Sequence, residues 1–465
     1  MSSAPAPVEA TRVTPYHGLL FVLLSAATFF EGFDVSMMSL AAADVSAGLG
    51  ISQQAWGVLY SVTRVGIVAS FLLLLFADRF GRRRLLFVTV LGFGAVTGLT
   101  ALARDPFEFA LLQTTARFFL QAEYALSVIV IGEEFPARLR GRAIGLLTSF
   151  ATVGVMVMAK VQPFVLLRPG TEGNALHDVL VAAVAWLQGA AGLEPDGASW
   201  RGLYLLGLPP LLLLFALRFA LRETRRFEAI AGERAARSWR EELRAQWEAA
   251  RTPFLPAYRR RTFTVALLWN FVYLLVAPAV AYWVIYARGT VGLDASTIGD
   301  IVFWAYVAGA FGNFLGGWLI DRIGRKNTCA LFYTLGAIAL LGLFHTTSMV
   351  GQYAWHISCV GSFGAAIAAT HVYASELFPT EIRATGYGWA TNLFGRVTEI
   401  ATPALIGVLI PSLGISWAVS LAGFGPILGA LFVLRFAPET RGLTLEQIEQ
   451  GLAGGARRAG PDPVA

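Results

Sequence analysis

The chain has 465 residues, of which 56% are hydrophobic and only 14% are charged, with a mean hydropathy of +0.61. Because a soluble globular chain carries about 25% charged residues, this composition excludes an ordinary soluble protein and predicts an all-α membrane protein. The net charge of +6 indicates no nucleic-acid partner, since the placement of the basic residues explains it.

Apolar runs long enough to cross a bilayer, which takes about 20 helical residues, recur along the chain. They cover residues 18–42, 53–77, 85–104, 106–132, 141–167 and 201–221, and then 263–287, 296–320, 328–348, 352–375, 384–410 and 414–436. We therefore predict twelve transmembrane helices. The expected organisation is a polar tail (1–17), an N-terminal bundle (18–221), a charged connector (222–262), a C-terminal bundle (263–436) and a second tail (437–465).

Residues 1–17 lack the basic region and short apolar core of a cleaved signal peptide, so we expect the first span to act as an uncleaved insertion signal. The run 175–193 is also apolar. If it crossed the membrane, every later arginine-rich loop would face outward. We therefore interpret it as an outer-surface hairpin or short interfacial helix within an insertion at about 168–200.

Arginines and lysines concentrate in alternate loops, above all in the connector, which holds eleven arginines from Arg222 to Arg261. By the positive-inside rule these loops are cytoplasmic. We expect a multi-pass protein of the bacterial inner (plasma) membrane with both termini in the cytoplasm.

The first span carries two carboxylates, Glu31 and Asp34, one helical turn apart. A charge near the membrane centre costs on the order of 3 kcal/mol, so an opposite charge at the same depth is expected. Arg117 in the fourth span lies about 22 Å from its cytoplasmic end, and Asp34 lies about 24 Å from the start of its own span. We predict that proton coupling is carried by Glu31, Asp34, Arg117 and Glu123, with a static ion pair as the alternative.

Segments of the chain repeat at a constant spacing. The motif DRFGRRR begins at Asp78 and DRIGRKN begins at Asp321, 243 residues later, and Glu133 and Glu376 lie the same distance apart. Constant offsets over separate segments indicate two homologous halves. We therefore expect two pseudo-symmetric six-helix bundles.

The triplet Glu-Thr-Arg at Glu223 recurs 216 residues later inside the P-E-T-R-G motif of Pro438–Gly442. This motif and the duplicated D-R-x-G-R-R/K loops resemble the signature of the major facilitator superfamily over nearly the whole chain. The resemblance implies two bundles that rock around a central cavity to give alternating access, nearest to the sugar porters and the aromatic-acid and organic-anion proton symporters. One departure is that the glycine four residues before the loop aspartate is Gly317 in the second copy but Leu74 in the first, so close packing there is expected to differ.

The resemblance also implies a cytoplasmic latch built from the duplicated loops. Asp78 would meet basic residues or a helix N-terminus near Arg140 or Arg383, because a carboxylate at a helix C-terminus opposes the helix dipole and needs a partner. The alternative is that the loops only set the topology through their arginines. The residues assigned to these gating motifs are Asp78, Arg79, Gly81, Arg82, Glu133, Arg140, Gly317, Asp321, Arg322, Gly324, Arg325, Glu376 and Arg383.

In the superfamily's proton symporters, a G-Y/F-D motif in the first span resembles Gly32-Phe33-Asp34 here. An arginine that opens the R-F-L motif of their fourth span resembles Arg117. The resemblance implies that Asp34 carries the proton and that Arg117 governs its proton affinity. Glu31 resembles the first acid of the D-G-Y/F-D pattern of aromatic-acid symporters.

Arg396, within NLFGRVTEIATP, resembles an arginine that faces the substrate in organic-anion and aromatic-acid carriers. Glu399, one turn away, is a residue that could neutralise it instead. The seventh span lacks the Q-Q-x-x-G pattern of sugar porters, which argues against a hexose, and its aromatic residues would suit a flat organic solute. The predicted substrate-binding residues are Arg64, Asn270, Tyr273, Asn392, Arg396 and Glu399.

The leading hypothesis is a secondary active transporter that couples symport of a small organic acid or related metabolite to protons. A proton/drug antiporter and a transport-dead membrane sensor are the alternatives. The sequence contains no recognisable catalytic triad, phosphate loop or metal cluster, so we expect no enzyme activity, no cofactor and no metal. The expected partners are the lipid bilayer, protons and a small-molecule substrate, with no nucleic acid, and the chain is expected to be a monomer. Cys329 and Cys359 are assigned to packing.

Overall fold

The structure is a computed structural model that describes residues 13–75, 80–167, 173–224, 244, 247–248, 251–378, 382–442 and 447, without the side chains of 74–75, 137–138 and 383–384. In this part of the chain, ten helices are long and apolar enough to cross a membrane. Helix α6 (Pro106–Glu134) adds an eleventh span, whose hydropathy is lowered by Arg117 and Glu123. The stretch Thr385–Phe436 turns at Gly414, where φ is 74°, and this division gives the twelfth.

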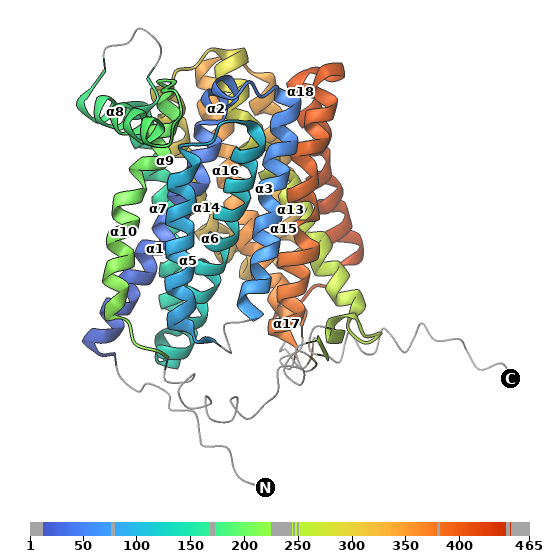
Figure 1. The fold of residues 1–465 in the computed structure, drawn as a ribbon. Coiled ribbons are helices and arrows are strands. Elements are labelled where there is room, and N and C mark those ends of the chain that lie inside the picture. Colours follow the sequence, from blue (N-terminus) through green and yellow to red (C-terminus); the bar gives the residue numbers. More distant parts are fainter. Residues whose placement is uncertain are drawn as a thin grey trace, which may run out of the picture. The chain divides into compact units, whose positions relative to one another are not determined.

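Contacts between the helices divide the chain into two units, the first of which comprises Met1–Ser238 and Ala281–Phe303. Its long helices run side by side (Figure 1). In chain order it contains α1 (Pro15–Leu40), α2 (Ala42–Gly48), α3 (Gln53–Leu75), α5 (Arg82–Thr100), α6, α7 (Ala137–Val165), α8 (Ala175–Ala190), α9 (Ser199–Leu206), α10 (Leu208–Leu217) and the 3₁₀ turn η1 (Arg218–Ala220).

The second unit comprises Trp239–Val280 and Trp304–Ala465. Its elements are the 3₁₀ turn η2 (Thr252–Phe254), α13 (Arg259–Tyr286), α14 (Ala295–Ile323), α15 (Arg325–His345), α16 (Met349–Glu376), α17 (Arg383–Gly388), the π-helix η4 (Trp389–Leu393), the 3₁₀ turn η5 (Phe394–Arg396) and α18 (Val397–Phe436). Helices α13 and α14 extend into the first unit, and the π-helix η3 (Ala287–Val291) between them lies wholly in the first unit. Cys329 and Cys359 are buried and free, which agrees with their assignment to packing.

Helices α1 and α7 cross closely because glycines lie at their contact. A Cβ atom on Gly32 would overlap the carbonyl oxygen of Ala151, and one on Gly154 would overlap that of Phe29. Small residues allow helix backbones in membranes to approach in this way. Gly32 therefore holds α1 against α7, and with it the position of Asp34 two residues later.

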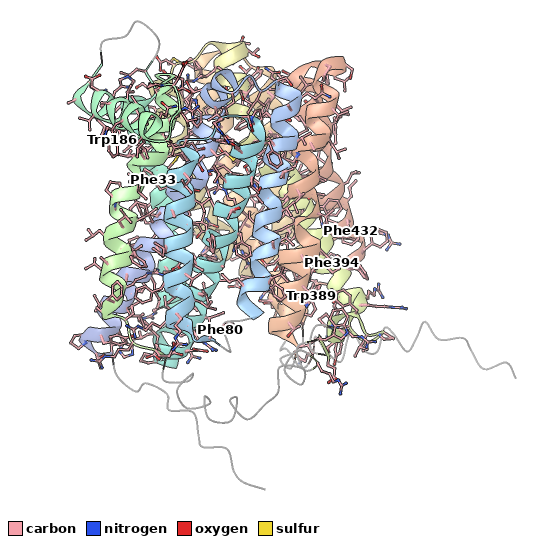
Figure 2. The ribbon with its side chains drawn as sticks, viewed as in Figure 1. Phe33, Phe80, Trp186, Trp389, Phe394 and Phe432 are labelled. Atoms are coloured by element: carbon pink, nitrogen blue, oxygen red, sulfur yellow. The ribbon has the colours of Figure 1, made fainter. Side chains whose placement is uncertain are left out.

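The apolar run that was expected to lie outside the bundle forms the 16-residue helix α8. Asn174 caps this helix, since its side-chain oxygen accepts a hydrogen bond from the backbone N–H of His177 at 3.0 Å. Leu180 is buried, whereas Trp186 is 72% exposed (Figure 2). The large apolar side chains of Leu176 and Val179 are exposed as well. A short helix with one packed face and several exposed apolar side chains fits the interfacial interpretation, and its depth in the membrane stays a prediction.

The segment Ala281–Phe303 comes from the second half of the sequence but belongs to the first unit. The indole N–H of Trp56 donates to the carbonyl oxygen of Ala281 at 3.0 Å, and Arg288 forms an ion pair of 2.9 Å with Asp44. Burial raises the pKa of the Asp44 carboxyl, and the neighbouring guanidinium opposes this shift. The end of α13 and the π-helix that follows are thus attached to α2 and α3.

Candidate functional site

Asp34 of α1 and Arg117 of α6 form an ion pair inside the first unit. Arg117 Nη1 lies 3.2 Å from Asp34 Oδ2, and Arg117 Nη2 donates to the carbonyl oxygen of Asp34 at 3.4 Å. The two side chains are only 1% and 2% exposed. The structure brings together the residues that depth in the membrane predicted to pair, and their part in proton coupling stays a prediction.

The Asp34–Arg117 pair is poorly hydrogen-bonded for a buried pair. Thr97 donates to Asp34 Oδ1 at 3.4 Å, but Oδ2 accepts no hydrogen bond from the residues that the structure describes. Arg117 Nε and Nη1 likewise lack a hydrogen-bond acceptor within this part of the chain. A buried charge with few hydrogen bonds is costly, so a proton or a small movement of Arg117 can change the state of this pair.

Glu123 of α6 makes a different kind of pair with Arg218 of η1. Arg218 Nη1 donates to Glu123 Oε2 at 2.9 Å, and its Nη2 pairs with Oε1. The hydroxyl of Thr89 donates to Oε2 and that of Ser127 to Oε1, the latter at 3.3 Å. Both carboxylate oxygens therefore have two donors, and the side chains of the pair are 0% and 4% exposed. Such saturation is typical of an ion pair that fixes helix packing.

Arg64 of α3 supplies a further buried positive charge to the first unit. Its guanidinium carbon lies 4.4 Å from the ring centre of Tyr60, and its Nη2 contacts the Tyr60 hydroxyl. Arg64 is 7% exposed and near enough to Arg117 for the two charges to repel each other. Glu31 is partly buried one turn before Asp34.

In the second unit, Arg396 lies beside Tyr273, which belongs to a group of packed ring side chains. Its Nη1 forms an ion pair of 2.6 Å with Glu399, and its guanidinium carbon lies 5.3 Å from the ring centre of Tyr273. The Trp269 ring centre lies 5.8 Å from that of Tyr273 and 4.6 Å from that of His371. Aromatic faces beside a guanidinium are groups that recognise a flat ring bearing a carboxylate.

Asn392 and Asn270 are the other two predicted substrate-binding residues of this unit. Asn392 belongs to η4, and its side chain is exposed. The side-chain amide of Asn270 instead forms hydrogen bonds with the main chain of Phe394 and Thr398. Asn270 therefore contacts the interrupted helix that carries Arg396.

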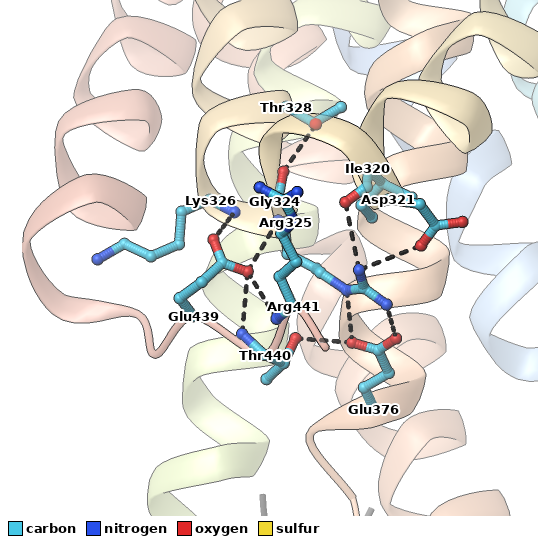
Figure 3. A network of polar contacts seen from close by, with 10 residues as sticks. All are labelled: Ile320, Asp321, Gly324, Arg325, Lys326, Thr328, Glu376, Glu439, Thr440 and Arg441. Atoms are coloured by element: carbon cyan, nitrogen blue, oxygen red, sulfur yellow. Dashed lines mark hydrogen bonds and ion pairs between the residues drawn. The ribbon is translucent and has the colours of Figure 1, made fainter. Parts of the chain in front are cut away.

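A polar cluster joins α15, α16 and the chain that follows α18 (Figure 3). Arg325 donates to both carboxylate oxygens of Glu376, from Nε at 2.9 Å and from Nη2 at 2.5 Å. The hydroxyl of Thr440 donates to Glu376 at 2.7 Å. The gating residues Arg325 and Glu376 are thus joined by hydrogen bonds within one cluster.

Glu439 occupies the N-terminus of α15 in this cluster. Its carboxylate accepts hydrogen bonds from the backbone N–H groups of Arg325 at 3.0 Å and Lys326 at 3.1 Å, and also from those of Thr440 and Arg441. The helix dipole favours a carboxylate at this place. Burial alone would raise the pKa of Glu439, but these four N–H groups hold it below its ordinary value.

The first unit contains a matching cluster. Arg82 Nη2 donates to Glu133 at 2.8 Å, and the hydroxyl of Thr224 donates to Glu133 at 2.8 Å. Glu223 accepts from the backbone N–H groups of Arg82 at 3.0 Å and Arg83 at 3.2 Å, at the start of α5. The sequence offsets of 243 and 216 residues relate each of these side chains to its counterpart in the second unit.

Gly81 and Gly324 explain why the duplicated motif carries glycine. They have φ values of 89° and 93°, in the left-handed region that other residues rarely adopt. A Cβ atom on Gly324 would also lie 2.7 Å from the carboxylate of Glu439. By contrast, a Cβ on Gly317 would meet nothing within 4 Å among the described residues, so packing does not require glycine there.

The remaining gating residues make local contacts or lie outside the described residues. Arg140 donates to the carbonyl oxygen of Phe135 at 3.5 Å, Asp321 pairs with Arg325 at 3.2 Å, and the Arg322 guanidinium lies 4.1 Å from the Trp318 ring centre. Asp78 and Arg79 are outside the described residues, as is the side chain of Arg383. The contact expected for Asp78 therefore stays a prediction.

Sequence reasoning missed Arg218, which lies within the predicted sixth span. A lone arginine in the apolar run LLLLFALRFAL was the available signal, since such a charge needs a buried partner. The position of Arg218 one turn before the arginine-rich connector made it resemble a residue at the membrane surface.

Paired charges inside apolar helices, with a duplicated helical plan, define a multi-pass membrane transport protein. The family model of the Major Facilitator Superfamily matches residues 24–391 and, in a second alignment, residues 277–459. The chain belongs to this superfamily. Membership confirms the predicted all-α fold of twelve spans and the assignment to transporters, which are not enzymes.

Relatives in bacteria match along most of their length. The chain is 28% identical to the gallate transporter of Pseudomonas putida, over 92% of this chain and 93% of the relative. It is 26% identical to a putative niacin/nicotinamide transporter of Bacillus subtilis, over 90% and 95%, and 24% identical to the cis,cis-muconate transport protein of Acinetobacter baylyi, over 89% and 94%.

Solved structures of membrane transporters share the fold. The D-xylose-proton symporter superposes with a TM-score of 0.70 at 19% identity, over 92% of this chain and 100% of that one. A bacterial homologue of the human lysosomal transporter Spinster, in an inward-facing conformation, superposes with a TM-score of 0.71 at 16% identity, over 97% and 100%. At such identities the likeness concerns the fold alone.

Proposed function

We propose that this protein is a proton-coupled symporter of a small, flat organic acid, with Asp34 as the group that carries the proton. The observation that supports this most directly is the difference between the two buried ion pairs of the first unit. The Asp34 carboxylate is poorly hydrogen-bonded, whereas each carboxylate oxygen of Glu123 accepts from two donors. A buried membrane carboxylate with few hydrogen bonds is suited to take up and release a proton, whereas a fully bonded one is suited to hold helices together.

The coupling follows from two opposing effects on the Asp34 carboxyl. Burial disfavours the charged carboxylate, and the adjacent guanidinium of Arg117 favours it. A movement of Arg117 away from Asp34 therefore promotes proton uptake, and its return promotes release. Arg64 is close to Arg117, so its positive charge helps to drive Arg117 away once Asp34 is neutral.

The substrate class is inferred from the aromatic group around Arg396. A carboxylate can pair with the guanidinium, which then exchanges Glu399 for the substrate, while the rings of Tyr273 and Trp269 contact a flat body. Gallate and cis,cis-muconate, which name two of the relatives, are small planar carboxylates. We therefore expect planar mono- or dicarboxylates to be preferred over hexoses and over cationic drugs.

The test is uptake into proteoliposomes with an acidic exterior. Labelled benzoate, gallate, cis,cis-muconate, nicotinate, xylose and a cationic drug are compared in the wild type and in Asp34→Asn. We expect at least one carboxylate to accumulate against its gradient in the wild type. The variant should lose this accumulation but keep the exchange of internal for external substrate, because the neutral amide mimics the protonated acid.

Asp105→Asn is the matched control, since it makes the same chemical change at an exposed helix cap where asparagine caps equally well. It should accumulate substrate like the wild type. Undiminished accumulation in Asp34→Asn would remove Asp34 from the coupling. Expulsion of the cationic drug without carboxylate uptake would favour an antiporter instead.

We further propose that the protein is a monomer in the bacterial inner membrane with both termini in the cytoplasm. The arginine-rich connector and loops support this orientation. In intact cells, a membrane-impermeant maleimide should label Trp186→Cys on α8 and leave Phe80→Cys, before α5, unlabelled. Labelling of Phe80→Cys alone would reverse the orientation.

A further inference from the structure

The helix that carries Arg396 is interrupted just before this residue. Between α17 and α18 the chain forms the π-helix η4 and the 3₁₀ turn η5 (Figure 2, Trp389 and Phe394). Leu393 has φ −105° and ψ −68°, and Arg396 has φ −96° and ψ 4°, both away from ordinary α-helical values. Such interruptions often occur at functional sites, and each has an identifiable cause.

The side chain of Asn270 replaces one hydrogen bond of the helix ladder. In a continuous α-helix, the carbonyl oxygen of Phe394 would accept from the backbone N–H of Thr398, four residues later. Here Asn270 Nδ2 donates to that carbonyl at 2.7 Å, and Asn270 Oδ1 accepts from that N–H at 2.9 Å. One amide from α13 therefore stands between the two partners and satisfies both.

Two further contacts hold the interrupted segment against α13. The hydroxyl of Thr398 donates to the carbonyl oxygen of Asn270 at 2.7 Å. A Cβ atom on Gly395 would lie 2.8 Å from the Cβ of Trp269 and 2.6 Å from the carbonyl oxygen of Ala390. The close approach of glycine to α13 brings the break within reach of the Asn270 amide.

We propose that Asn270 is a positioning residue that directs Arg396 toward the substrate by keeping this helix open. Arg396 lies midway between the two bridged backbone groups, so their separation sets the direction of its side chain toward Tyr273 and Glu399. The proposal rests on the proposed role of Arg396 as the group that binds the substrate carboxylate. It assigns to Asn270 an action through Arg396, in place of the direct substrate contact that the sequence suggested.

Removal of the amide allows the helix to close. In Asn270→Ala, the carbonyl of Phe394 and the N–H of Thr398 have no side-chain partners and are expected to bond with each other, because unpaired buried backbone groups are costly. Each residue of an α-helix turns the chain by about 100°, so even a partial change of winding redirects the Arg396 side chain.

A double-mutant cycle on transport kinetics tests the proposal, because it measures whether two residues act through one another. We expect Asn270→Ala to raise the KM for the carboxylate about tenfold with little change in maximal rate, and Arg396→Gln to raise it further. The double variant should have a KM within about twofold of Arg396→Gln alone. Asn313→Ala is the matched control, since its amide donates only to the carbonyl of Gly309 in its own helix at 3.2 Å, and its KM should be unchanged.

Full additivity, with Asn270→Ala raising KM tenfold again in the Arg396→Gln background, would overturn the proposal and make Asn270 a direct substrate contact. A wild-type KM in Arg396→Gln would instead refute the proposed role of Arg396. If Asn270→Ala does not fold, Thr398→Val tests the proposal instead, because it removes the hydrogen bond from the Thr398 hydroxyl to the carbonyl oxygen of Asn270. This variant should raise KM about threefold in the wild type and not at all in Arg396→Gln, and an unchanged KM in the wild-type background would contradict the proposal.

Discussion

Arg117 and Arg218 each face a carboxylate inside the first unit, at 1% and 0% exposure. Arg218 meets a glutamate that two hydroxyls also bond, whereas Arg117 meets an aspartate whose ion-paired oxygen accepts no hydrogen bond from the described residues. The two pairs therefore differ in the number of hydrogen bonds around the carboxylate and not in burial, and on this difference we base their proposed structural and switchable roles.

The first prediction concerns Arg218→Met. The change leaves Glu123 buried without its counter-charge, and breaking a buried ion pair in this way costs about 3–5 kcal/mol. The midpoint of thermal unfolding in detergent should fall markedly, as measured by the loss of monodisperse protein on heating. The folded fraction should retain the wild-type ratio of protons to substrate.

The double variant Glu123→Gln with Arg218→Met is the control, since it removes both charges and should recover most of the lost stability. A wild-type melting midpoint in Arg218→Met together with lost coupling would place this pair in the transport machinery.

The packing of a single helix depends on how closely the neighbouring helices can approach it. Gly32 of α1 faces the backbone of α7 with no room for a Cβ atom, while Gly18, near the start of the same helix, has nothing within 4 Å of such an atom. The G-F-D motif thus combines a packing requirement at its first residue with a buried, ion-paired carboxylate at its third.

The second prediction compares Gly32→Ala with Gly18→Ala. The extra methyl group at residue 32 forces α1 and α7 apart, at a cost of about 1–3 kcal/mol or more. At residue 18 the same change should be neutral or slightly stabilising, because alanine is favoured over glycine in helices. Melting midpoints of the purified variants measure both effects, and equal midpoints would show that the close crossing is absent.

Over the whole molecule, the internal repeat is visible in side-chain contacts as well as in sequence. Glu223 and Glu439 each accept hydrogen bonds from the first backbone N–H groups of a helix, α5 in one unit and α15 in the other. In each half of the chain, the segment that follows the last span therefore places a glutamate carboxylate at the N-terminus of the third long helix.

The third prediction is that Glu223→Gln and Glu439→Gln each lower stability by about 0.5–1 kcal/mol, since each removes a charge that the helix dipole favours. The two clusters share no residue, so the losses should add. For Glu439, whose pKa is lowered, the stabilisation is present above the ordinary glutamate value of about 4.3 and is lost as pH falls through the lower folded value. Melting midpoints of the wild type and Glu439→Gln should therefore differ at pH 7 and converge in acid, and a constant difference would contradict this.

The sequence predicted the features that depend on period and depth. Apolar runs gave the twelve spans, constant offsets gave the duplication, and equal depth paired Asp34 with Arg117. It did not predict features that depend on the rotation of a helix about its axis. Depth in the membrane did not indicate that Glu123 would pair with Arg218. The residue types around Asn270 did not indicate that its amide would bridge two backbone groups of another helix.

If Asp34 carries the transported proton, substrate should drive protons across the membrane only when this carboxyl is present. Proteoliposomes containing a pH-sensitive dye and no initial pH gradient receive an external carboxylate substrate. We expect the lumen to acidify with the wild type and not with Asp34→Asn, although the variant still exchanges substrate. Equal acidification by the two proteins would contradict this role of Asp34.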